Sequence, residues 1–474
     1  MSRRFCKLFA QAPFALDTTF RTSIQQEYVS SITLLPDGRV LLSGQMRFPG
    51  DTFTRGSAVL LPDGTRDPSF TSFVGQGKLW PWNGSYYVGV GHIVRRLTGG
   101  GYLDPSFILM NADPYFNSLQ GGDYHVYPDG RVLMSGAHQV NYPAGGWQGL
   151  QNLIWFTNTG YLDTTRAPRT GNGVVYNFRE LPDGKFICSG TCTQFDGRSC
   201  DRIFRVHPDG ALDTTYHTNI NWGQAYTFLP LADGRTYIGG FFRRAGFPND
   251  TLRIARFLPD GGLDAAFSVP HFSMGSLTNG LSFGPYIRSI IPWSDGKLII
   301  TGVFQNVNGT PHRGICMVDS IGQLQPEFEY CGVGTYTNMG FTYGGGEGLI
   351  PDADSTHYYI WGTYTGYSDG VTNDPLQRFV TRLHAGDITT GASSATAPPV
   401  FSLYPNPSSG NVTLELEQVP GNALLVVRDA LGRVVQRQRV TDHYTTLSLA
   451  QAGVHVVELH VATERVASVR VLVE

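Results

Sequence analysis

The stretch LLPDGRVLLSG at residues 34–44 is repeated along this chain with small changes. The further copies are VYPDGRVLMSG (126–136), ELPDGKFICSG (180–190), PLADGRTYIGG (230–240) and PWSDGKLIITG (292–302). Each copy joins two runs of apolar residues that favour strands through a turn built on Asp-Gly. Two eroded copies, at 81–91 and 349–362, bring the count to seven. Repetition of one hairpin unit is the signature of a fold that lays down the same supersecondary element many times.

A second motif, of the form LDxxF, alternates with the first along the chain. Its Asp residues are Asp17, Asp67, Asp104, Asp163, Asp213 and Asp264. An Asp followed within two residues by Ser or Thr caps a turn by accepting backbone N–H groups. We therefore interpret these carboxylates as turn caps rather than as a ring of metal ligands. Units of about 45–60 residues with several short strands each are typical of a β-propeller.

The first and last copies complement each other. The chain opens with the LDxxF fragment at 15–20, which has no strands before it. The seventh copy ends with the strand-like run RFVTRL at 378–383, which no LDxxF follows. We expect residues 15–20 to form the outer strand of the last blade, which closes the ring and removes a free sheet edge.

The two motifs, in fixed phase over residues 15–387, resemble the delta-60 family. That family is a bacterial propeller-type repeat with the pattern LxPDGKhhhGG…RLxxDGxLDxxF. The resemblance implies an extracellular or surface setting and supplies no established activity.

Beyond residue 387 the composition of the chain changes. Residues 388–400 are small and polar and end in a double Pro, which is linker composition. Residues 401–474 alternate apolar and polar positions, which predicts a small β-sandwich.

This tail resembles the C-terminal sorting domain of type IX secretion cargo, also known as the Por-secretion tail. The residues that carry the resemblance are Tyr404, Pro405, Asn406, Pro407, Gly410, Gly432 and Gly453, together with Asp429, Leu431, Arg433, Val434, Val435 and the run at 452–457. His455 departs from the Tyr that the family usually has there. The resemblance implies recognition by the type IX secretion machinery through residues 401–474. Removal of the tail, with release or attachment to surface lipopolysaccharide, would follow.

The sequence therefore predicts an all-β chain: a seven-bladed β-propeller followed by a small Ig-like β-sandwich. The boundaries are a leader or signal-peptide remnant at 1–12, the propeller at 13–387, the linker at 388–400 and the sorting domain at 401–474. The leader has a basic start, a short apolar patch and a small-x-small end. We expect the protein to be secreted, or attached to the outer cell surface, after passage through the periplasm.

Several classes of function find no support in the sequence. The net charge is −3 and no long basic run exists, which argues against nucleic-acid binding. No apolar run approaches the roughly 18 residues that span a bilayer. No GxSxG, HExxH or P-loop motif is present. We expect no metal and no cofactor, and a monomeric chain.

Six cysteines are too few to build a fold of this length. Cys192 and Cys200 flank the turn at 195–197, so they could meet across a hairpin and form a disulfide. Free buried thiols, or a zinc site that also includes Cys188 and His207, remain as alternatives.

Aromatic residues near turns and strand ends are the remaining candidates for function. They are Trp80, Trp82, Trp147, Trp222 and Trp361. Most aromatics in a propeller pack between blades, but some could stack against sugar rings. We expect a non-catalytic binding module for a glycan or a surface protein. The alternatives are a polysaccharide lyase or hydrolase with its site at the channel mouth, and a structural or adhesion protein.

Overall fold

The computed structural model describes residues 14–110, 116–278, 284–352, 355–385, 401–416, 419, 423–429, 433–461 and 464–473. The leader at 1–12 and the linker at 388–400 lie outside these ranges, as does Gly432 of the sorting motif. The chain divides into two compact bodies, Met1–Ile388 and Thr389–Glu474, which we call the propeller body and the C-terminal body. In the described parts of both, regular structure consists of strands and two short 3-10 turns, η1 (Pro143–Gly145) and η2 (Ser294–Gly296).

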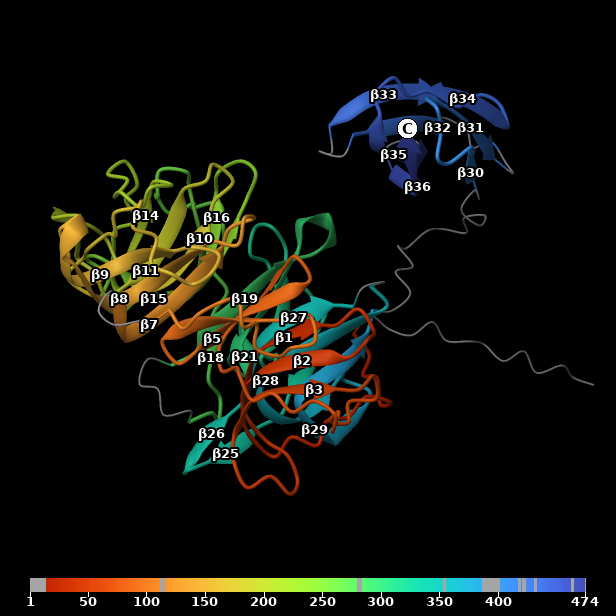
Figure 1. Cartoon of the computed structure of the whole chain (residues 1–474). Coiled ribbons are helices and arrows are strands. Elements are labelled where there is room, and N and C mark those ends of the chain that lie inside the picture. The colour runs from red at the N-terminus through yellow and green to blue at the C-terminus, as the bar shows by residue number, and fades with distance from the viewer. Residues whose placement is uncertain are drawn as a thin grey trace, which may run out of the picture. The chain divides into compact units, whose positions relative to one another are not determined.

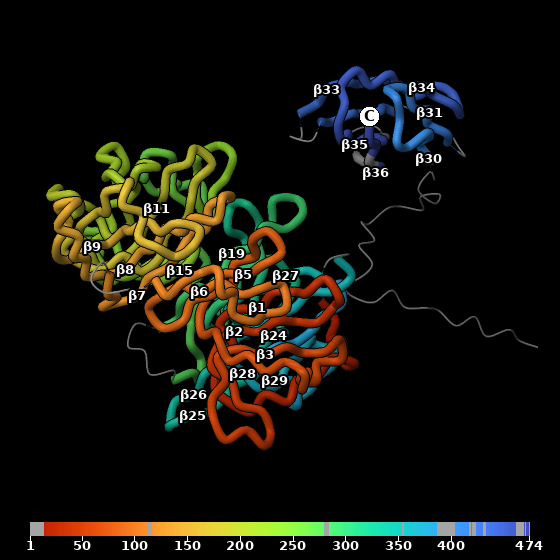
Figure 2. Tube along the Cα trace, viewed as in Figure 1, coloured from red at the N-terminus to blue at the C-terminus, as the bar shows by residue number. Residues whose placement is uncertain are grey.

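The described strands of the propeller body form three-stranded antiparallel repeats, which follow one another along the chain (Figures 1 and 2). The first three repeats are β1 (Gln26–Leu34), β2 (Val40–Arg47) and β3 (Arg55–Leu60); β4 (Leu79–Trp82), β5 (Ser85–Val90) and β6 (Ile93–Leu97); and β7 (Phe116–Val126), β8 (Val132–Tyr142) and β9 (Trp147–Phe156). The fourth and fifth are β10 (Val175–Glu180), β11 (Phe186–Gly190) and β14 (Ile203–Val206); and β15 (Ile220–Pro230), β16 (Thr236–Arg244) and β17 (Thr251–Phe257). The sixth and seventh are β19 (Tyr286–Pro292), β20 (Leu298–Val303) and β23 (Ile315–Val318); and β27 (Gly345–Pro351), β28 (His357–Ser368) and β29 (Asn373–His384). The fold class predicted from the sequence, an all-β propeller followed by a β-sandwich, is confirmed.

The turn chemistry explains why each repeat forms. In the first repeat the Leu35 N–H donates to the carbonyl of Arg39, and Gly38 takes a φ of +82°, which a Gly adopts without strain. The LDxxF Asp caps the next turn as the sequence predicted, since Asp67 Oδ1 accepts the backbone N–H of Ser69 at 2.9 Å. Hydrophobic cores then lie between neighbouring repeats. One core joins Leu41 and Val59 of the first repeat to Val88 and Leu97 of the second.

The predicted ring closure is confirmed. Leu16 forms an antiparallel bridge with Leu383 of β29, and the His384 N–H donates to the carbonyl of Ala15 at 2.8 Å. In the other repeats the equivalent bridge is local, as between Leu60 and Arg66. Strands β1 to β3, drawn in red and orange, lie beside β28 and β29 accordingly (Figures 1 and 2). One core holds Phe20, Val40 and Val380 together, so the first and seventh repeats pack as neighbours.

The described part of the propeller body also contains short strands outside the three-stranded repeats. They are β12 (Gln194–Phe195), β13 (Arg198–Ser199), β18 (Phe272–Ser273), β21 (Asn306–Val307), β22 (Thr310–Pro311), β24 (Gly332–Val333), β25 (Tyr336–Asn338) and β26 (Phe341–Tyr343). The pair β12 and β13 forms the hairpin expected around residues 195–197.

The C-terminal body is a sandwich of two sheets over its own core. One sheet comprises β30 (Phe401–Tyr404), β31 (Asn411–Leu416) and β34 (Tyr444–Ser448). The other comprises β32 (Ala423–Arg428), β33 (Val434–Arg439), β35 (Gly453–Val461) and β36 (Glu464–Val473). Leu414 and Leu447 from the first sheet share one buried cluster with Val427 and Leu459 from the second. Apolar residues alternate along β31, which is the pattern of a strand with one face on a core.

Candidate functional site: a cavity among the first strands

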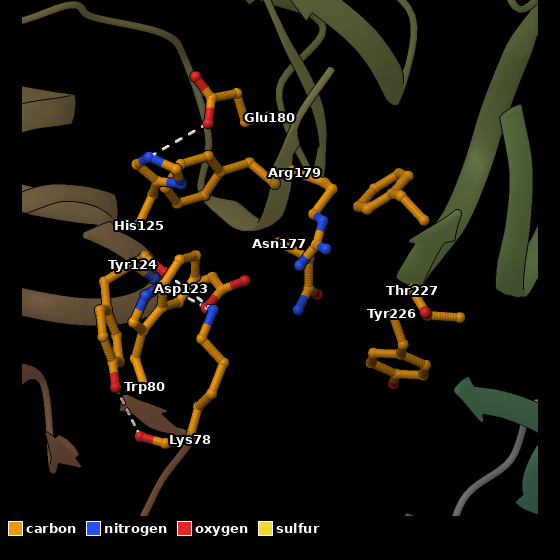
Figure 3. Close-up of a pocket in the computed structure, with 12 residues that line it drawn as sticks. Lys78, Trp80, Asp123, Tyr124, His125, Asn177, Arg179, Glu180, Tyr226 and Thr227 are labelled. Atoms are coloured by element: carbon orange, nitrogen blue, oxygen red, sulfur yellow. Dashed lines mark hydrogen bonds and ion pairs between the residues drawn. The ribbon is translucent and has the colours of Figure 1, made fainter. Parts of the chain in front are cut away.

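A cavity of about 160 Å³ lies among the first strands of four consecutive repeats (Figure 3). Its walls come from Lys78 and β4, and from β7, β10 and β15. The blades of a propeller are arranged around a central channel. Because only first strands and the residue before one of them line it, the cavity belongs to the inner edge of these repeats.

One wall is a cluster of a cation, a carboxylate and aromatic rings. Lys78 Nζ lies 2.5 Å from Asp123 Oδ1 and donates to the Tyr124 carbonyl at 2.8 Å. The same ammonium group lies 4.8 Å from the centre of the Trp80 ring, within cation–π range. The Tyr124 hydroxyl donates back to the Lys78 carbonyl at 2.7 Å, a contact drawn in Figure 3. This wall is therefore held in place by its own polar contacts.

A histidine and a carboxylate face each other on the neighbouring wall. His125 Nε2 lies 3.4 Å from Glu180 Oε2, and the His125 ring packs 5.1 Å from the Trp80 ring. Burial, aided by the positive charges of Lys78 and Arg179, lowers the pKa of His125 to about 4. Burial also raises the pKa of Glu180. His125 is thus neutral at pH 7, and its Nε2 has no hydrogen-bond partner within the described structure.

The far side of the cavity is more open and carries polar side chains. Asn177 accepts a hydrogen bond from Gln224 at 2.9 Å, and Arg179 is exposed. Tyr226 of the fifth repeat contacts the sixth repeat, where the Arg288 guanidinium lies 4.5 Å above its ring. Arg288 in turn pairs with Glu347 of the seventh repeat at 3.1 Å. Aromatic faces next to groups of both charges can bind a polar, ring-shaped ligand.

Of the five tryptophans predicted to bind a ligand, the structure brings Trp80 to this cavity. Trp82 donates from Nε1 to the Pro128 carbonyl at 3.1 Å, and Trp361 donates to the Ser30 carbonyl at 3.2 Å while 9% exposed. Both contacts join neighbouring repeats. Trp147 packs 5.3 Å from Tyr142 of its own repeat. Trp222 is 37% exposed, with the Arg243 guanidinium 4.0 Å above its ring.

Sequence reasoning missed the charged and polar residues of the cavity. Asp123, Asn177 and Thr227 each stand seven positions before a turn Gly, at 130, 184 and 234. The repeats do not match at this position, although the turn that follows is nearly invariant among them. Variation at one register position of an otherwise regular repeat is the signal that could have identified this wall.

The described cysteines are free thiols in this structure. Cys192 is buried and Cys200 is half-buried on either side of the β12–β13 hairpin, and burial raises the pKa of both thiols, that of Cys200 to about 12. Cys188 is buried in the same core. The disulfide between Cys192 and Cys200 stays a prediction for an oxidising compartment.

The sorting run at 404–407 lies where β30 leads into β31. Tyr404, Pro405, Asn406 and Pro407 connect β30 to β31, and all four side chains are exposed. Asn406 Oδ1 accepts the Leu472 N–H at 2.9 Å, which ties this loop to β36.

Two further glycines of the motif, Gly410 and Gly453, lie within the described residues. The Gly410 carbonyl accepts the Leu449 N–H at 2.6 Å. Gly453 opens β35 with a φ of +123°, a conformation that favours Gly.

These features define a β-propeller protein with a C-terminal sandwich. Residues 402–474 match the family model described as the secretion system C-terminal sorting domain. Residues 181–216, 231–267 and 294–317 match the domain of unknown function DUF5122 beta-propeller, with which the delta-60 resemblance is compatible. The protein therefore carries a sorting domain that directs export by type IX secretion to the cell surface or beyond it.

Similar solved structures are distant. One is the extracellular domain of a hybrid two-component system from B. thetaiotaomicron, at 10% identity and a TM-score of 0.41, covering 98% of this chain and 59% of that one. Another is PorZ, a surface component of the type-IX secretion system of Porphyromonas gingivalis, at 12% identity and a TM-score of 0.37, covering 95% of this chain and 66% of that one. This chain thus spans about three fifths to two thirds of their lengths. At these TM-scores the likenesses carry nothing about function. No curated protein matches the chain.

The described segments contain no helix that is long and apolar enough to cross a membrane.

Proposed function

We propose that this protein is a type IX secretion cargo whose propeller binds a glycan or a surface protein without transforming it. The observation that supports a binding role is the cavity among β4, β7, β10 and β15, where Trp80 stands beside Lys78 and His125. Pockets with a few placed polar groups among aromatic rings are the usual ligand sites of proteins. Within the propeller, Trp80 offers a stacking face, and Asn177 and Arg179 offer hydrogen bonds across the cavity.

The experiment uses the full chain, purified and incubated with glycan arrays and with envelope extracts of the producing cell. Retention of one glycan class or one surface protein at micromolar concentration is the expected result. Arg179→Gln should weaken that binding about tenfold, since one charge-assisted hydrogen bond contributes about 1.5–3 kcal/mol. Trp147→Ala, outside the cavity, serves as the matched control. Unchanged binding by Arg179→Gln and Trp80→Ala would contradict the placement of the site.

A specific observation also favours a second candidate, an enzyme of the polysaccharide lyase or hydrolase class. His125 is held neutral at pH 7 beside Glu180, and a neutral imidazole can accept a proton from a substrate. Lys78 and Arg179 would offset the charge of an acidic sugar. Turnover of a polysaccharide panel that disappears in His125→Gln, while binding survives, would support the enzyme. Binding without turnover would support the binding module.

A further inference from the structure

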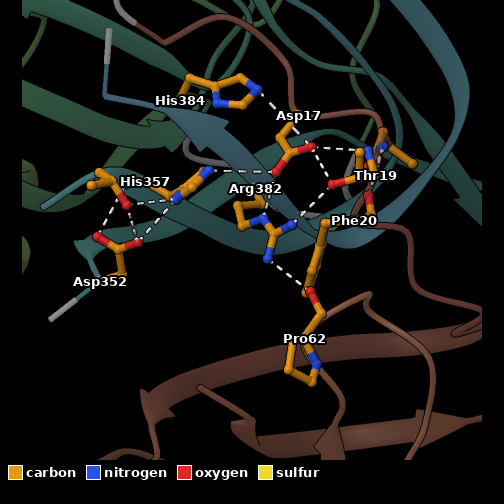
Figure 4. Close-up of polar contacts among 10 residues, drawn as sticks. Asp17, Thr19, Phe20, Pro62, Asp352, His357, Arg382 and His384 are labelled. Carbon is orange, nitrogen blue, oxygen red and sulfur yellow. Dashed lines mark hydrogen bonds and ion pairs between the residues drawn. The ribbon is translucent and has the colours of Figure 1, made fainter. Parts of the chain in front are cut away.

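Three potential metal ligands meet where the ring closes (Figure 4). Asp17 comes from the N-terminal segment, His357 begins β28 and His384 ends β29. His357 Nε2 lies 3.6 Å from Asp17 Oδ2, and His384 Nε2 lies 4.0 Å from Asp17 Oδ1. One ligand atom from each of the three residues can be chosen so that all lie within 4.8 Å of one another. In tetrahedral zinc sites the ligand atoms stand about 2.0–2.2 Å from the ion and therefore about 3.3–3.6 Å apart. Small rotations of the two rings would bring these atoms to that spacing.

The orientation of His357 suits a ligand. Its Nδ1 lies 3.1 Å from Asp352 Oδ2, as the dashed lines of Figure 4 show. A carboxylate that holds Nδ1–H leaves the lone pair on Nε2 and fixes the plane of the ring, which is the usual outer shell of a zinc-bound histidine. Nε2 is the atom that faces Asp17.

A comparison with the other repeats shows what is unusual here. The residue five positions before the strand-end Gly is a permanent cation that contacts the LDxxF Asp in three repeats. These pairs are Arg39 Nη1 with Asp67 at 2.8 Å, Lys185 Nζ with Asp213 at 3.0 Å, and Arg235 Nη1 with Asp264 at 3.3 Å. In the seventh repeat this position is His357, five residues before Gly362. The seventh repeat therefore has a histidine where those repeats place a permanently charged side chain beside their Asp.

The charged groups among and around the three ligands carry a net negative charge, which favours a bound cation. Arg382 Nε donates to Asp17 Oδ2 at 2.7 Å and stays next to the three ligands. Asp17 and Asp352 bring two negative charges against the one positive charge of Arg382, a formal sum of −1. A divalent cation is thus favoured by this sum, although repulsion from Arg382 weakens its binding. Affinity in the micromolar range follows, weaker than that of a structural zinc finger.

We propose that Asp17, His357 and His384 bind Zn²⁺ and that the ion clips the N-terminal segment to the seventh repeat. Three protein ligands leave the fourth position of the ion to water. Asp17 also caps a turn, as the sequence predicted, since its Oδ1 accepts the Thr19 N–H at 2.9 Å. The ion joins parts of the chain that are distant in sequence, so it stabilises the closed ring. This site is separate from the ligand cavity, and its test does not depend on the proposed binding function.

The experiment uses the full chain, purified without a histidine tag and stripped of metal by EDTA and dialysis. Zinc chloride is titrated into it by calorimetry, and thermal unfolding is followed with and without the ion. We expect one Zn²⁺ to bind per chain with micromolar affinity, and a rise in Tm that grows with zinc concentration, because the ion binds the folded state. His384→Ala should weaken binding at least tenfold and abolish the rise in Tm. The control is His271→Ala, because His271 is exposed and lies outside the cluster of Asp17, His357 and His384.

A second variant separates zinc binding from a purely structural role. His357→Arg restores the cation that the first, fourth and fifth repeats carry at this position. We expect it to fold with an unchanged or higher Tm without zinc and to show no response to zinc. The proposal is overturned if the wild-type chain binds no Zn²⁺, or if His357→Arg and His384→Ala respond to it as the wild-type chain does.

Discussion

The guanidinium of Arg382 donates from Nε to the carboxylate of Asp17 at 2.7 Å, although 365 positions separate the two residues in the sequence. The same contact is local in other repeats, where Arg96 meets Asp104 at 2.7 Å and Arg256 meets Asp264 at 2.6 Å. One Arg–Asp pair of the repeat has thus been divided between the first and the last segment of the propeller. Both residues are largely buried, with side chains 14% and 4% exposed.

Replacing Arg382 by Met should lower the free energy of unfolding by about 3 kcal/mol, because it leaves the buried Asp17 carboxylate without its charged partner. Urea unfolding of the full chain measures this loss. Arg166→Met is the control, since its Nε lies 3.9 Å from Asp163 and the side chain is 35% exposed. Its cost should stay below about 1 kcal/mol. Equal losses of unfolding free energy in the two variants would show that the Arg382–Asp17 pair contributes no more than an exposed ion pair.

Deleting residues 1–20 should open the ring. The deletion removes Phe20, which is fully buried, and leaves the outer edge of β29 unpaired. We expect a lower Tm and faster hydrogen exchange of the His384 amide, which donates to the Ala15 carbonyl in the closed ring. A synthetic peptide of residues 13–24 should restore part of the protection. Full protection in the truncated chain without the peptide would refute the closure.

The stability of the propeller should fall as the pH drops from 6.5 towards 4. His138 is fully buried, and burial lowers its pKa to about 4. It donates from Nε2 to the Ser135 carbonyl at 2.9 Å and accepts from the Ser118 hydroxyl at 2.9 Å, so the neutral ring is fully bonded. An unfolded His takes up a proton near pH 6.5, whereas the folded one resists until about pH 4. The contribution of His138 to the free energy of unfolding is therefore complete above pH 6.5. It is lost progressively as the pH falls from 6.5 to about 4.

Over that window the loss amounts to about 3 kcal/mol for this group, at about 1.36 kcal/mol per pH unit. Urea unfolding at a series of pH values measures the slope. His138→Gln should flatten the slope between pH 6.5 and 5, whatever its effect on stability at pH 7.5. His271→Gln, at an exposed histidine, should leave the slope as it is. An unchanged slope in His138→Gln would mean that other groups govern the acid sensitivity.

Asn406→Ala in the sorting domain should reduce export. The substitution removes the acceptor that ties the 404–407 loop to Leu472 of β36, at a cost of about 1 kcal/mol. We expect the secretion machinery to recognise this loop by its shape, which the substitution would change. Comparing the protein in the medium and on the cell surface with that retained in the periplasm measures the effect. Thr441→Ala, which removes an exposed hydroxyl contact with Asp442, is the control.

Much of the fold could be predicted because its determinants are local. Gly38 at the turn and Asp67 at the cap act within a few residues, so their spacing predicts hairpins and their recurrence predicts a propeller. The closure by residues 15–20 followed from a missing piece at each end of the pattern. The sequence pattern could not predict which aromatic side chains are exposed. Trp361 was a candidate for ligand binding from the sequence, but in the structure it is buried and packs between repeats.

The cavity and the candidate metal ligands escaped the sequence because their members come from separate repeats. Nothing in the residues near His125 shows that Glu180 faces it, and nothing near Asp17 shows that His357 and His384 do. Such pairs are set by the arrangement of the repeats around the centre. The useful sign in the sequence is a departure from the repeat, such as His357 where Arg39 or Lys185 would stand.

The bridge between Leu16 and Leu383 makes the last blade a joint between distant stretches of polypeptide. In the first six repeats the outer segment pairs with a strand close to it in sequence. In the seventh, Leu16 pairs with Leu383, so the loop closed by this pairing contains nearly the whole propeller. The entropy lost in closing so long a loop exceeds that of a short one by only a few kcal/mol. Long-range contacts nevertheless form slowly. We therefore expect a late folding intermediate in which the propeller is nearly complete but residues 15–20 have not yet paired with β29. The same pairing would be the first to open on unfolding.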